Sequence, residues 1–260
     1  MDPEAYIAIV IGSSRGLGAA LAAGLVARRC LRVIGVSRTW PDAGAGGPGW
    51  CSDERYRHVA LDVAAPDAPA QLRSVLPQSS DAPLLVIYNA ATVRSDLEPD
   101  GTIDFAVFNQ VNAVGVTGLG HVLQAVQGPL LARGGVFVGV SSFAALSPPV
   151  VEPRVAYPAT KAYLDAALRA LRLAWRGRVR VVTVHLGRIG GSGHGFLSRW
   201  IRPSYAMAAE HVLRRLSAGR VPDEIDYTLA YTVAYHYVLP LLPDRFVAPL
   251  VTRLAGPQSR

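Results

Sequence analysis

The sequence predicts a three-layer α/β/α fold, in which helices cover both faces of a doubly wound parallel sheet within a single domain. Short apolar segments rich in β-branched residues alternate with segments of helical periodicity, which is the order of β-α-β units. The chain has 260 residues, 50% of them hydrophobic and 17% charged, so it has enough apolar surface for one large core. Neither a linker nor an internal repeat divides it.

Each expected strand is a short apolar run that ends in turn-forming residues. The six ranges are 6–11, 31–36, 56–61, 84–88, 135–140 and 179–185. Helices are expected between them at 17–28, 68–75, 103–131 and 156–176. In the last helix, Leu164, Leu168, Leu171 and Trp175 form one apolar stripe, as expected of a helix that packs on a sheet.

Several protein classes are disfavoured by composition. Two cysteines and a few scattered histidines provide neither a disulfide framework nor metal-ligand spacing, so no metal site is expected. No basic stretch followed by an apolar segment opens the chain, which argues against a signal peptide. The most apolar stretch, residues 228–243, is interrupted by His236 and Pro240 and is too short to span a membrane. A cytoplasmic protein without a transmembrane span is therefore expected.

The kind of basic residue is more informative than the net charge of +7. Basic residues are scattered and no nucleic-acid-binding motif is present, so nucleic acid is not an expected partner. Of the 26 basic residues only Lys161 is a lysine. An ammonium kept where guanidinium serves everywhere else indicates a chemical role for this residue.

The first candidate site is a glycine-rich segment, residues 12–18, between the first expected strand and the first helix. Gly12 permits a sharp turn, Gly16 lets the backbone approach a pyrophosphate, and Gly18 lets helix and strand pack closely. The helix N-terminus adds N–H donors and the positive end of a dipole. The expected residues of this dinucleotide-binding turn are Gly12, Ser14, Arg15, Gly16, Leu17 and Gly18.

The residues after the second strand indicate which dinucleotide binds. Sites for NAD usually place an acidic residue there, whereas this chain has Ser37 and Arg38. Arg38, helped by Arg15, is expected to hold a 2′-phosphate through charge-assisted hydrogen bonds, which favours NADP. The alternative is that both are ordinary surface arginines of an arginine-rich chain.

The second candidate site is the pair Tyr157 and Lys161 at the start of the fourth helix. Residues four apart share a helical face, which places the ammonium beside the phenol. A fixed positive charge favours phenolate, so the pKa of Tyr157 is expected to be lowered and the residue to serve as an acid or base. The alternative is a solvated lysine next to a packed tyrosine.

Taken together, the glycine motif and the Tyr157–Lys161 pair resemble those of the short-chain dehydrogenase/reductase family over residues 5–190. The resemblance implies a Rossmann-type fold and an NADP-dependent oxidoreductase. Such an enzyme transfers hydride between the nicotinamide and the carbonyl or alcohol carbon of a small-molecule substrate. It also implies a homodimer or a homotetramer.

Further cofactor contacts follow from the resemblance. Asp62, followed by Val63, matches the residue that contacts the adenine, with a turn or helix-capping carboxylate as the alternative. Asn89-Ala90-Ala91 matches the loop whose small residues let the cofactor ribose pass. Gly187 and Ile189 match the loop after the sixth strand, where the backbone of Ile189 meets the nicotinamide carboxamide.

The resemblance also implies the catalytic roles. Tyr157 donates a proton, Lys161 lowers the tyrosine pKa and holds the ribose hydroxyls, and the backbone carbonyl of Asn112 holds a relay water. Ser142 hydrogen-bonds the developing oxyanion. Neighbours on a strand face opposite ways, so only one of Ser141 and Ser142 is expected to point to the site, and Ser142 is preferred.

Three positions depart from the family pattern. Tyr88 replaces the first asparagine of the loop, and Leu186 replaces the usual proline after the sixth strand. Ala91 replaces a glycine, which costs about 1 to 2 kcal/mol if the backbone needs a positive φ there.

The substrate is expected to be a hydrophobic carbonyl compound, aromatic or polyketide-like. Residues 192–245 are expected to form a substrate lid and an aromatic tail. Tyr227, Tyr231 and Tyr235 would form one stripe of a helix, packed on the core or a partner subunit, closing the site, or contacting a membrane surface.

Three alternative functions are also considered. One is reduction of a 3-oxoacyl group bound to an acyl carrier protein, docked by a basic patch. The residues of that patch would be Arg199, Arg202, Arg214 and Arg215. A second is a non-catalytic sensor that binds NADP. A third, an extended-family enzyme acting on nucleotide sugars, is disfavoured by the glycine spacing and the absence of a longer C-terminal substrate domain.

Overall fold

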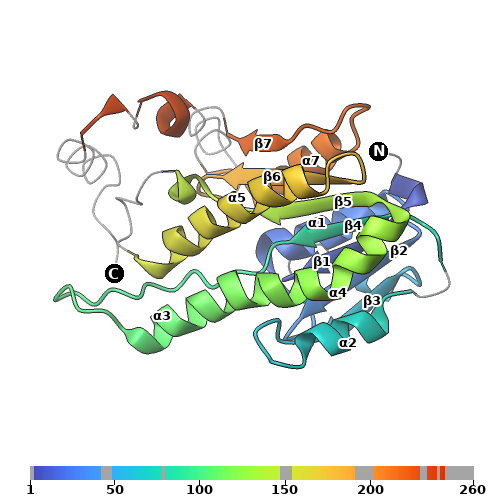
Figure 1. Cartoon of the computed structure of the whole chain (residues 1–260), viewed down its shortest axis with the longest axis horizontal. Coiled ribbons are helices and arrows are strands. Elements are labelled where there is room, and N and C mark those ends of the chain that lie inside the picture. Colours follow the sequence, from blue (N-terminus) through green and yellow to red (C-terminus); the bar gives the residue numbers. More distant parts are fainter. Residues whose placement is uncertain are drawn as a thin grey trace.

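Seven strands form one sheet at the centre of the computed structural model (Figure 1). They are β1 (Ile7–Ile11), β2 (Arg32–Ser37), β3 (Tyr56–Ala60), β4 (Leu84–Tyr88), β5 (Gly135–Val140), β6 (Val179–Leu186) and β7 (Glu224–Tyr227). The strand order is β3-β2-β1-β4-β5-β6-β7, and every neighbouring pair is parallel. The structure describes residues 3–41, 49–77, 80–146, 154–190, 202–228, 233–238 and 241–243.

Helices connect the strands and cover both faces of the sheet. They are α1 (Gly16–Ala27), α2 (Ala68–Val75), α3 (Phe105–Asn112), α4 (Gly118–Arg133), α5 (Ala156–Ala174) and α7 (Tyr205–Leu216). Short 3-10 helices lie at Pro3–Ala5, Trp50–Ser52 and Phe143–Ala145, and π-helical turns at Ala113–Thr117 and Ala234–Val238. None of the helices in the described part of the chain is long and apolar enough to cross a bilayer.

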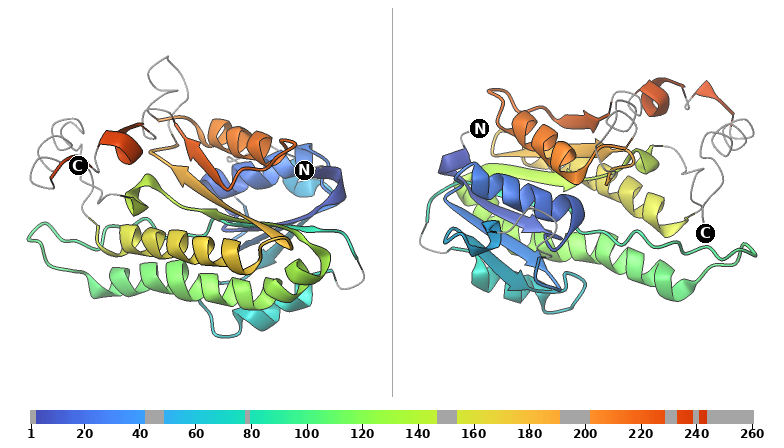
Figure 2. Two further views of the ribbon diagram at one scale, coloured as in Figure 1. Left: turned by 45° about the horizontal axis from the view of Figure 1, so that its top comes forward. Right: turned by 180° about the vertical axis from the view of Figure 1, so that it is seen from behind.

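The core lies in two layers, one on each face of the sheet (Figure 2). On one face α1 and α7 pack against the sheet, and on the other α2, α4 and α5 do so. Strand β1 shows why the sequence folds this way: Ile7, Ile9 and Ile11 belong to the second layer, while Ala8 and Val10 belong to the first. All five are buried, because a central parallel strand is covered on both faces.

The predicted fold class is confirmed, and the predicted elements recur within one or two residues except in two regions. The helix expected at 103–131 is α3 and α4 joined by the π-helical turn Ala113–Thr117. Helix α7 and strand β7 were not predicted from the sequence. Tyr227 ends β7, where its ring stacks on His211 at 4.5 Å, so the expected helical stripe that includes Tyr227 is wrong. Tyr231 lies outside the described residues.

The order of the strands fixes where a ligand can bind. The chain winds outward from β1 in both directions, so the connections after β1 and β4 leave the sheet toward opposite faces. In such sheets a crevice opens outside the carboxyl ends of the strands at this point of reversal. The segments that follow β1 and β4 begin with Gly12 and Asn89, which are both predicted site residues.

Candidate active site

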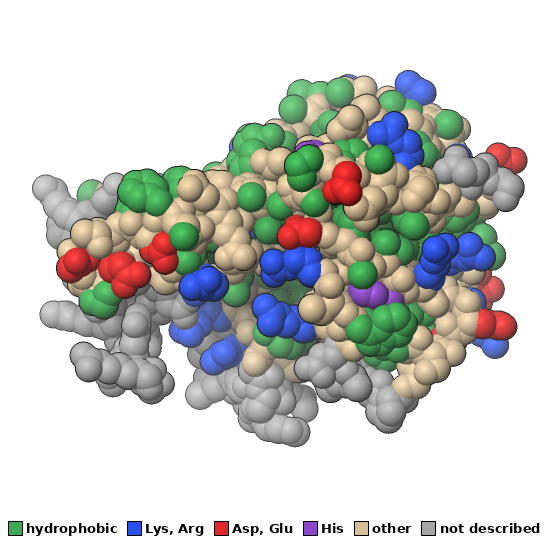
Figure 3. All heavy atoms as spheres, turned by 90° about the horizontal axis from the view of Figure 1, so that it is seen from below, with side chains coloured by type: hydrophobic (Ala, Val, Ile, Leu, Met, Phe, Trp, Pro, Cys, Tyr) green, Lys and Arg blue, Asp and Glu red, His purple; other side chains and the backbone are tan. Residues whose placement is uncertain are grey.

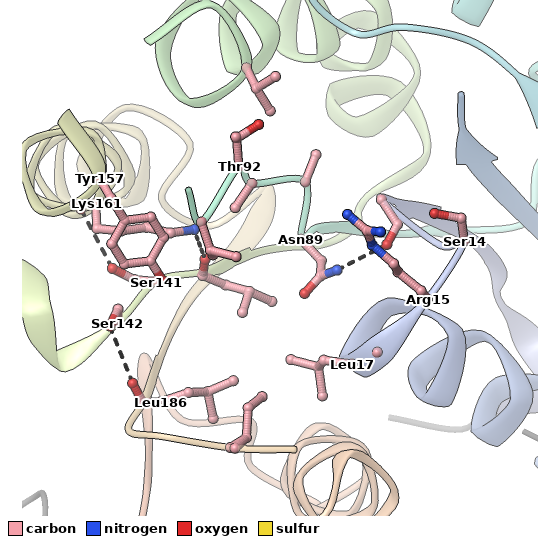
Figure 4. A pocket seen from close by; sticks show the side chains of 18 of the residues that line it. Ser14, Arg15, Leu17, Asn89, Thr92, Ser141, Ser142, Tyr157, Lys161 and Leu186 are labelled. Atoms are coloured by element: carbon pink, nitrogen blue, oxygen red, sulfur yellow. Dashed lines mark hydrogen bonds between the residues drawn. The ribbon is translucent and has the colours of Figure 1, made fainter. Parts of the chain in front are cut away.

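A cavity of about 840 Å³ lies at the carboxyl ends of the strands. Its wall includes residues that follow six strands, among them Gly12, Arg38, Asp62, Asn89, Ser142 and Gly187. Figure 4 shows Arg15 and Leu17 on one side of it and Ser142, Tyr157 and Lys161 on the other. The cavity therefore joins the glycine-rich turn to the tyrosine–lysine pair, although Gly12 and Tyr157 are 145 positions apart in the sequence.

Nearly all predicted site residues line this cavity. They are Gly12, Ser14, Arg15, Gly16, Leu17, Ser37, Arg38, Asp62, Val63, Asn89, Ala90, Ala91, Ser142, Tyr157, Lys161, Gly187 and Ile189. Two predicted residues, Gly18 and Asn112, are not part of its wall. Gly18 packs against the carbonyl of Gly12 instead, and the side chain of Asn112 is hydrogen-bonded within its own helix.

The glycine-rich turn is built by close backbone contacts. Gly12 has a φ of +85°, and a Cβ placed on it would lie 2.8 Å from the backbone of Ala90. A Cβ on Gly18 would lie 1.9 Å from the carbonyl oxygen of Gly12, so Gly18 allows α1 to pack against the turn. The side-chain amide of Asn89 donates a hydrogen bond of 3.0 Å to the same carbonyl, which fixes the β4 loop beside the turn (Figure 4).

The N-terminus of α1 faces the cavity with its backbone donors available. Arg15 occupies the N-cap position but makes no side-chain capping hydrogen bond, and the first turn contains no acidic residue. An uncapped helix N-terminus of this kind attracts anions through its N–H groups and its dipole. Together with the close turn at Gly12, these residues fit the pyrophosphate of a dinucleotide.

The end of β2 combines a buried hydroxyl with exposed guanidinium groups. The Ser37 hydroxyl donates to the carbonyl of Thr39 at 2.9 Å and lies 3.0 Å from Nε2 of His58. Arg38 and Arg15 are both exposed and line the cavity here. Asp62 also lines the cavity, and its carboxylate accepts the backbone N–H of Ala64 at 2.9 Å. It therefore both stabilises the turn after β3 and forms part of the cavity wall.

Tyr157 and Lys161 lie in the first turns of α5 and face the same part of the cavity (Figure 4). The side chain of Lys161 is buried, with 5% of the residue exposed. Its ammonium donates a hydrogen bond of 2.7 Å to the carbonyl of Val140 and lies 5.7 Å from the centroid of the Tyr157 ring. The lysine is therefore a fixed charge beside the tyrosine and not a solvated surface group.

The two serines after β5 have different partners. Ser142 donates to the carbonyl of Leu186 at 3.4 Å and accepts the N–H of Ala144 at 3.2 Å. Its hydroxyl also acts on Tyr157, where it lowers the pKa of the phenol. Ser141 is buried and its hydroxyl lies 3.5 Å from the carbonyl of Lys161. Both line the cavity, and Ser142 is the one whose hydroxyl lowers the pKa of Tyr157.

The pKa of Tyr157 departs from the sequence-based expectation. Burial raises the pKa of the phenol, and the hydrogen bond with Ser142 and the charge of Arg154 only partly oppose the rise. The expected lowering is thus wrong for this structure, because the loss of solvation outweighs the nearby positive charges. Burial also lowers the pKa of Lys161 to about 8, while the carboxylate of Asp165 opposes that change.

Asn112 is the last residue of α3, directly before the π-helical turn. Its side-chain amide donates to the carbonyl of Phe108 at 3.1 Å, within its own helix. The hydroxyl of Tyr88, the residue that departs from the family loop, donates to the carbonyl of Val114 in the π-helical turn. A second cavity of about 10 Å³, lined in part by Gly115 and Lys161, lies between this turn and α5. It has about the volume that one water molecule needs.

Ala91 causes no backbone strain. Among the described residues that are not glycine, only Arg29 has a positive φ. The loop after β4 therefore accommodates alanine where the family pattern has glycine, and the expected cost of a left-handed alanine does not arise.

Several residues of the cavity wall were not predicted from the sequence. They include Thr92, Arg94, Arg154 and Arg188. Arg202 and Tyr205, which belong to the expected lid, also line the cavity. Tyr205, at the start of α7, lies against the glycines of two loops: a Cβ would be 3.4 Å from its ring at Gly16 and 2.6 Å from it at Gly190. The backbone N–H of Gly190 donates to the carbonyl of Pro203 at 2.9 Å, which joins the loop after β6 to the segment before α7.

Solved structures share this fold over most of their length. A short chain dehydrogenase from Burkholderia cenocepacia J2315, in complex with NADP, has a TM-score of 0.73 at 24% identity and covers 99% of this chain and 100% of its own. A short-chain dehydrogenase from Streptomyces avermitilis has a TM-score of 0.72 at 20% identity, with 95% of each chain covered. An NADPH-bound carbonyl reductase from chicken fatty liver has a TM-score of 0.68 at 20% identity and covers 85% of this chain and 95% of its own.

The sequence itself also matches a family. No curated protein matches the chain. The family model described as short chain dehydrogenase, however, matches residues 6–195, which contain the glycine-rich turn, the serines after β5 and the tyrosine–lysine pair. Because this match spans most of the chain and agrees with the fold and the geometry of the cavity, the protein belongs to the short-chain dehydrogenase family.

Proposed function

We propose that this short-chain dehydrogenase is an NADPH-dependent reductase of a carbonyl group. The observation that carries the proposal is that Ser142, Tyr157 and Lys161 line the same cavity as the glycine-rich turn. An acid, a charged lysine and a hydrogen-bond donor thereby stand at one end of a dinucleotide-sized space, and a phosphate-binding helix N-terminus stands at the other.

NADP fits the charge at the adenosine end of the cavity. Arg38 and Arg15 are exposed there, and the end of β2 carries the hydroxyl of Ser37 where an NAD site would carry a carboxylate. Guanidinium groups can donate paired hydrogen bonds to a 2′-phosphate. The solved relatives that contain NADP or NADPH support the same choice.

Each residue at the other end has a role that its contacts allow. The bound nicotinamide supplies the hydride. Tyr157 is a neutral phenol at neutral pH, a state that its raised pKa favours further, so it carries the proton that it donates to the oxygen of the substrate. Ser142, which lines the cavity beside the phenol and lowers its pKa, is proposed to donate to that same oxygen as negative charge develops on it. Lys161 is held by Val140 beside the ring, where it stabilises negative charge on the tyrosine after proton transfer.

Proton resupply is assigned to the region around Asn112. The small cavity between the π-helical turn and Lys161 could hold one water, and the turn begins directly after Asn112. A water there would link the ammonium of Lys161 to the backbone of the interrupted helix. This assigns Asn112 a backbone role, consistent with a side chain that is bonded within its own helix.

The substrate is proposed to have a hydrophobic part. Val93 and Ile189 line the cavity and offer it apolar surface. The segment that contains Arg202 and Tyr205 is proposed to close the end of the cavity where the substrate binds. It is the part of the expected lid that lines the cavity. Assembly as a homodimer or homotetramer remains part of the proposal.

The direct test is consumption of NADPH and of NADH by the purified protein with a panel of ketones, aldehydes and acyl thioesters. We expect NADPH to be oxidised with at least one carbonyl compound, and faster than NADH. Binding of NADPH, followed by its fluorescence, provides an independent control. Tight binding without turnover of any compound would contradict the proposal and favour an NADP-binding sensor.

A further inference from the structure

The wall of the active-site cavity is strongly cationic. Its basic residues are Arg15, Arg38, Arg94, Arg154, Lys161, Arg188 and Arg202, and Asp62 is the only acidic residue among the described residues that line it. Figure 3 shows basic side chains gathered around a hollow on one face of the molecule. So many positive charges around one cavity indicate ligands that carry negative charge.

The phosphates of the proposed cofactor account for only part of this charge. Arg15 and Arg38 lie at the adenosine end, and Lys161 belongs to the catalytic group. Arg94 and Arg154, in contrast, come from the segment after the Asn89 loop and from the segment that leads into α5. They are therefore at the end of the cavity where Tyr157 lies.

A buried carboxylate holds these two segments together. Asp96 is 0% exposed, and its two oxygens accept the backbone N–H groups of Val155 at 2.9 Å and Ala156 at 2.8 Å. Arg94 lies two residues before Asp96, and Arg154 directly precedes Val155, so the same clamp places both arginines on adjoining segments. The guanidinium carbon of Arg154 lies 5.7 Å from the centroid of the Tyr157 ring.

This arrangement places two basic residues on the segments beside the catalytic end of the cavity. The carboxylate of Asp96 accepts backbone N–H groups at the start of α5. Within the described ranges, no ion pair or hydrogen bond involves the side chain of Arg94, which is exposed at the cavity wall. An anionic group of a ligand bound beside Tyr157 would accept charge-assisted hydrogen bonds from guanidinium groups of this wall.

We infer that the substrate carries an anionic group, a carboxylate or a phosphate, which Arg94 and Arg154 bind while the carbonyl faces Tyr157. This inference rests on the proposed carbonyl reductase function and refines its substrate from a hydrophobic carbonyl compound to an anionic one. Guanidinium groups recognise both kinds of anion through paired hydrogen bonds. The apolar wall residues then contact the part of the substrate that joins the anion to the carbonyl.

Matched pairs of ketones test the inference by steady-state kinetics with NADPH. One arm compares 4-oxopentanoate and 4-acetylbenzoate with their methyl esters, and a second compares dihydroxyacetone phosphate with dihydroxyacetone. We expect the charged member of at least one pair to have a kcat/KM about tenfold or more above that of its neutral partner. The arm that shows this ratio distinguishes a carboxylate from a phosphate. A ratio near one in all pairs would overturn the inference.

Variants identify the residues responsible. R94Q and R154Q should reduce the charged-to-neutral ratio of kcat/KM about tenfold, with most of the effect in KM, and R94K should restore part of it. R57Q is the matched control, because Arg57 is exposed on β3 and is not part of the cavity wall. It should leave the ratio unchanged. Equal losses for charged and neutral members in R94Q and R154Q would contradict the inference.

A binding measurement separates this inference from the proposed reaction. Isothermal titration calorimetry of the protein saturated with NADP⁺ should detect 4-acetylbenzoate or dihydroxyacetone phosphate, and R94Q should weaken that binding about tenfold. The measurement needs no turnover, so it supports or overturns the anion site even if no ketone is reduced. Binding that is equally strong to the neutral partners would overturn it.

Discussion

The ammonium of Lys161 donates a hydrogen bond of 2.7 Å to the backbone carbonyl of Val140, the last residue of β5. This bond joins the helix that carries the tyrosine to the strand after which the two serines follow. The lysine is almost fully buried, so the site accommodates a compact ammonium, whereas the larger planar guanidinium used elsewhere in this chain would have to displace its neighbours.

The first prediction follows from this fit. K161R should lower kcat by about 100-fold or more, although it keeps the positive charge, because the guanidinium cannot take the same position beside Tyr157. The measurement is NADPH oxidation with the best ketone, with circular dichroism to verify folding. R169Q, at an exposed position of the same helix, is the control and should keep full activity. A folded K161R enzyme with near-normal kcat would refute the account of why lysine is required.

Cofactor preference gives a second prediction. R38Q should raise the KM for NADPH about tenfold or more and change the KM for NADH little, because only NADPH carries the 2′-phosphate. The matched control is R32Q, at the opposite end of β2, which does not line the cavity. Equal changes in KM for both cofactors would show that Arg38 does not bind the 2′-phosphate.

The Asp96 clamp gives a third prediction, on stability and turnover together. D96A should lower the free energy of unfolding by about 1 to 3 kcal/mol, because two backbone N–H groups at the start of α5 lose their buried acceptor. It should also reduce kcat, since Tyr157 directly follows Ala156. D100A removes an exposed carboxylate bonded only to Thr102 in its own turn, so it should change kcat little. Urea denaturation and NADPH oxidation give the two readouts.

A buried imidazole gives a fourth prediction, on stability and pH. His185 lies 3.0 Å from Asp165 and 3.0 Å from Asp226. Burial lowers the pKa of His185, but the two carboxylates outweigh it and raise the pKa from 6.5 to about 9. Because the pKa of His185 is higher in the folded than in the unfolded state, its protonation stabilises the folded protein. This stabilisation is fully present below pH 6.5 and is lost as the pH rises through about 9.

The test compares the wild-type protein with H185Q. Urea denaturation should show that the advantage of the wild type in free energy of unfolding is largest below pH 6.5 and shrinks as the pH approaches about 9. The pKa shift of His185 corresponds to a loss of unfolding free energy on the order of 3 kcal/mol across this pH range. A difference between the two proteins that does not change over this range would show that His185 is not held as a cation.

Local patterns in the sequence were enough to predict the central sheet and the two main motifs. Strands β4 and β5 and helix α2 lie at the predicted residues, because their apolar runs and boundaries are unambiguous. Helix α7 could also have been found: Ser204 caps it, and Ala208, Val212 and Leu216 follow at helical spacing. The π-helical turn could not, because it is a small change within one continuous apolar pattern.

Properties that depend on distant contacts could not be predicted from the sequence. Asp96 and Ala156 are 60 positions apart, so no local pattern links the clamp to the catalytic helix. The direction of the pKa shift of Tyr157 depends on how deeply the phenol is buried, which the spacing to Lys161 does not reveal. The cationic wall is likewise assembled from loops after several strands.

The most direct measurement of the central claim is the turnover of Y157F with NADPH and the best carbonyl substrate, beside NADPH binding measured on the same preparation. We predict that kcat falls between about 100-fold and 10,000-fold while the Kd for NADPH changes little, because only the acidic hydroxyl is removed. A Y157F protein that binds NADPH and retains near-normal kcat would contradict the assignment of Tyr157 as the proton donor.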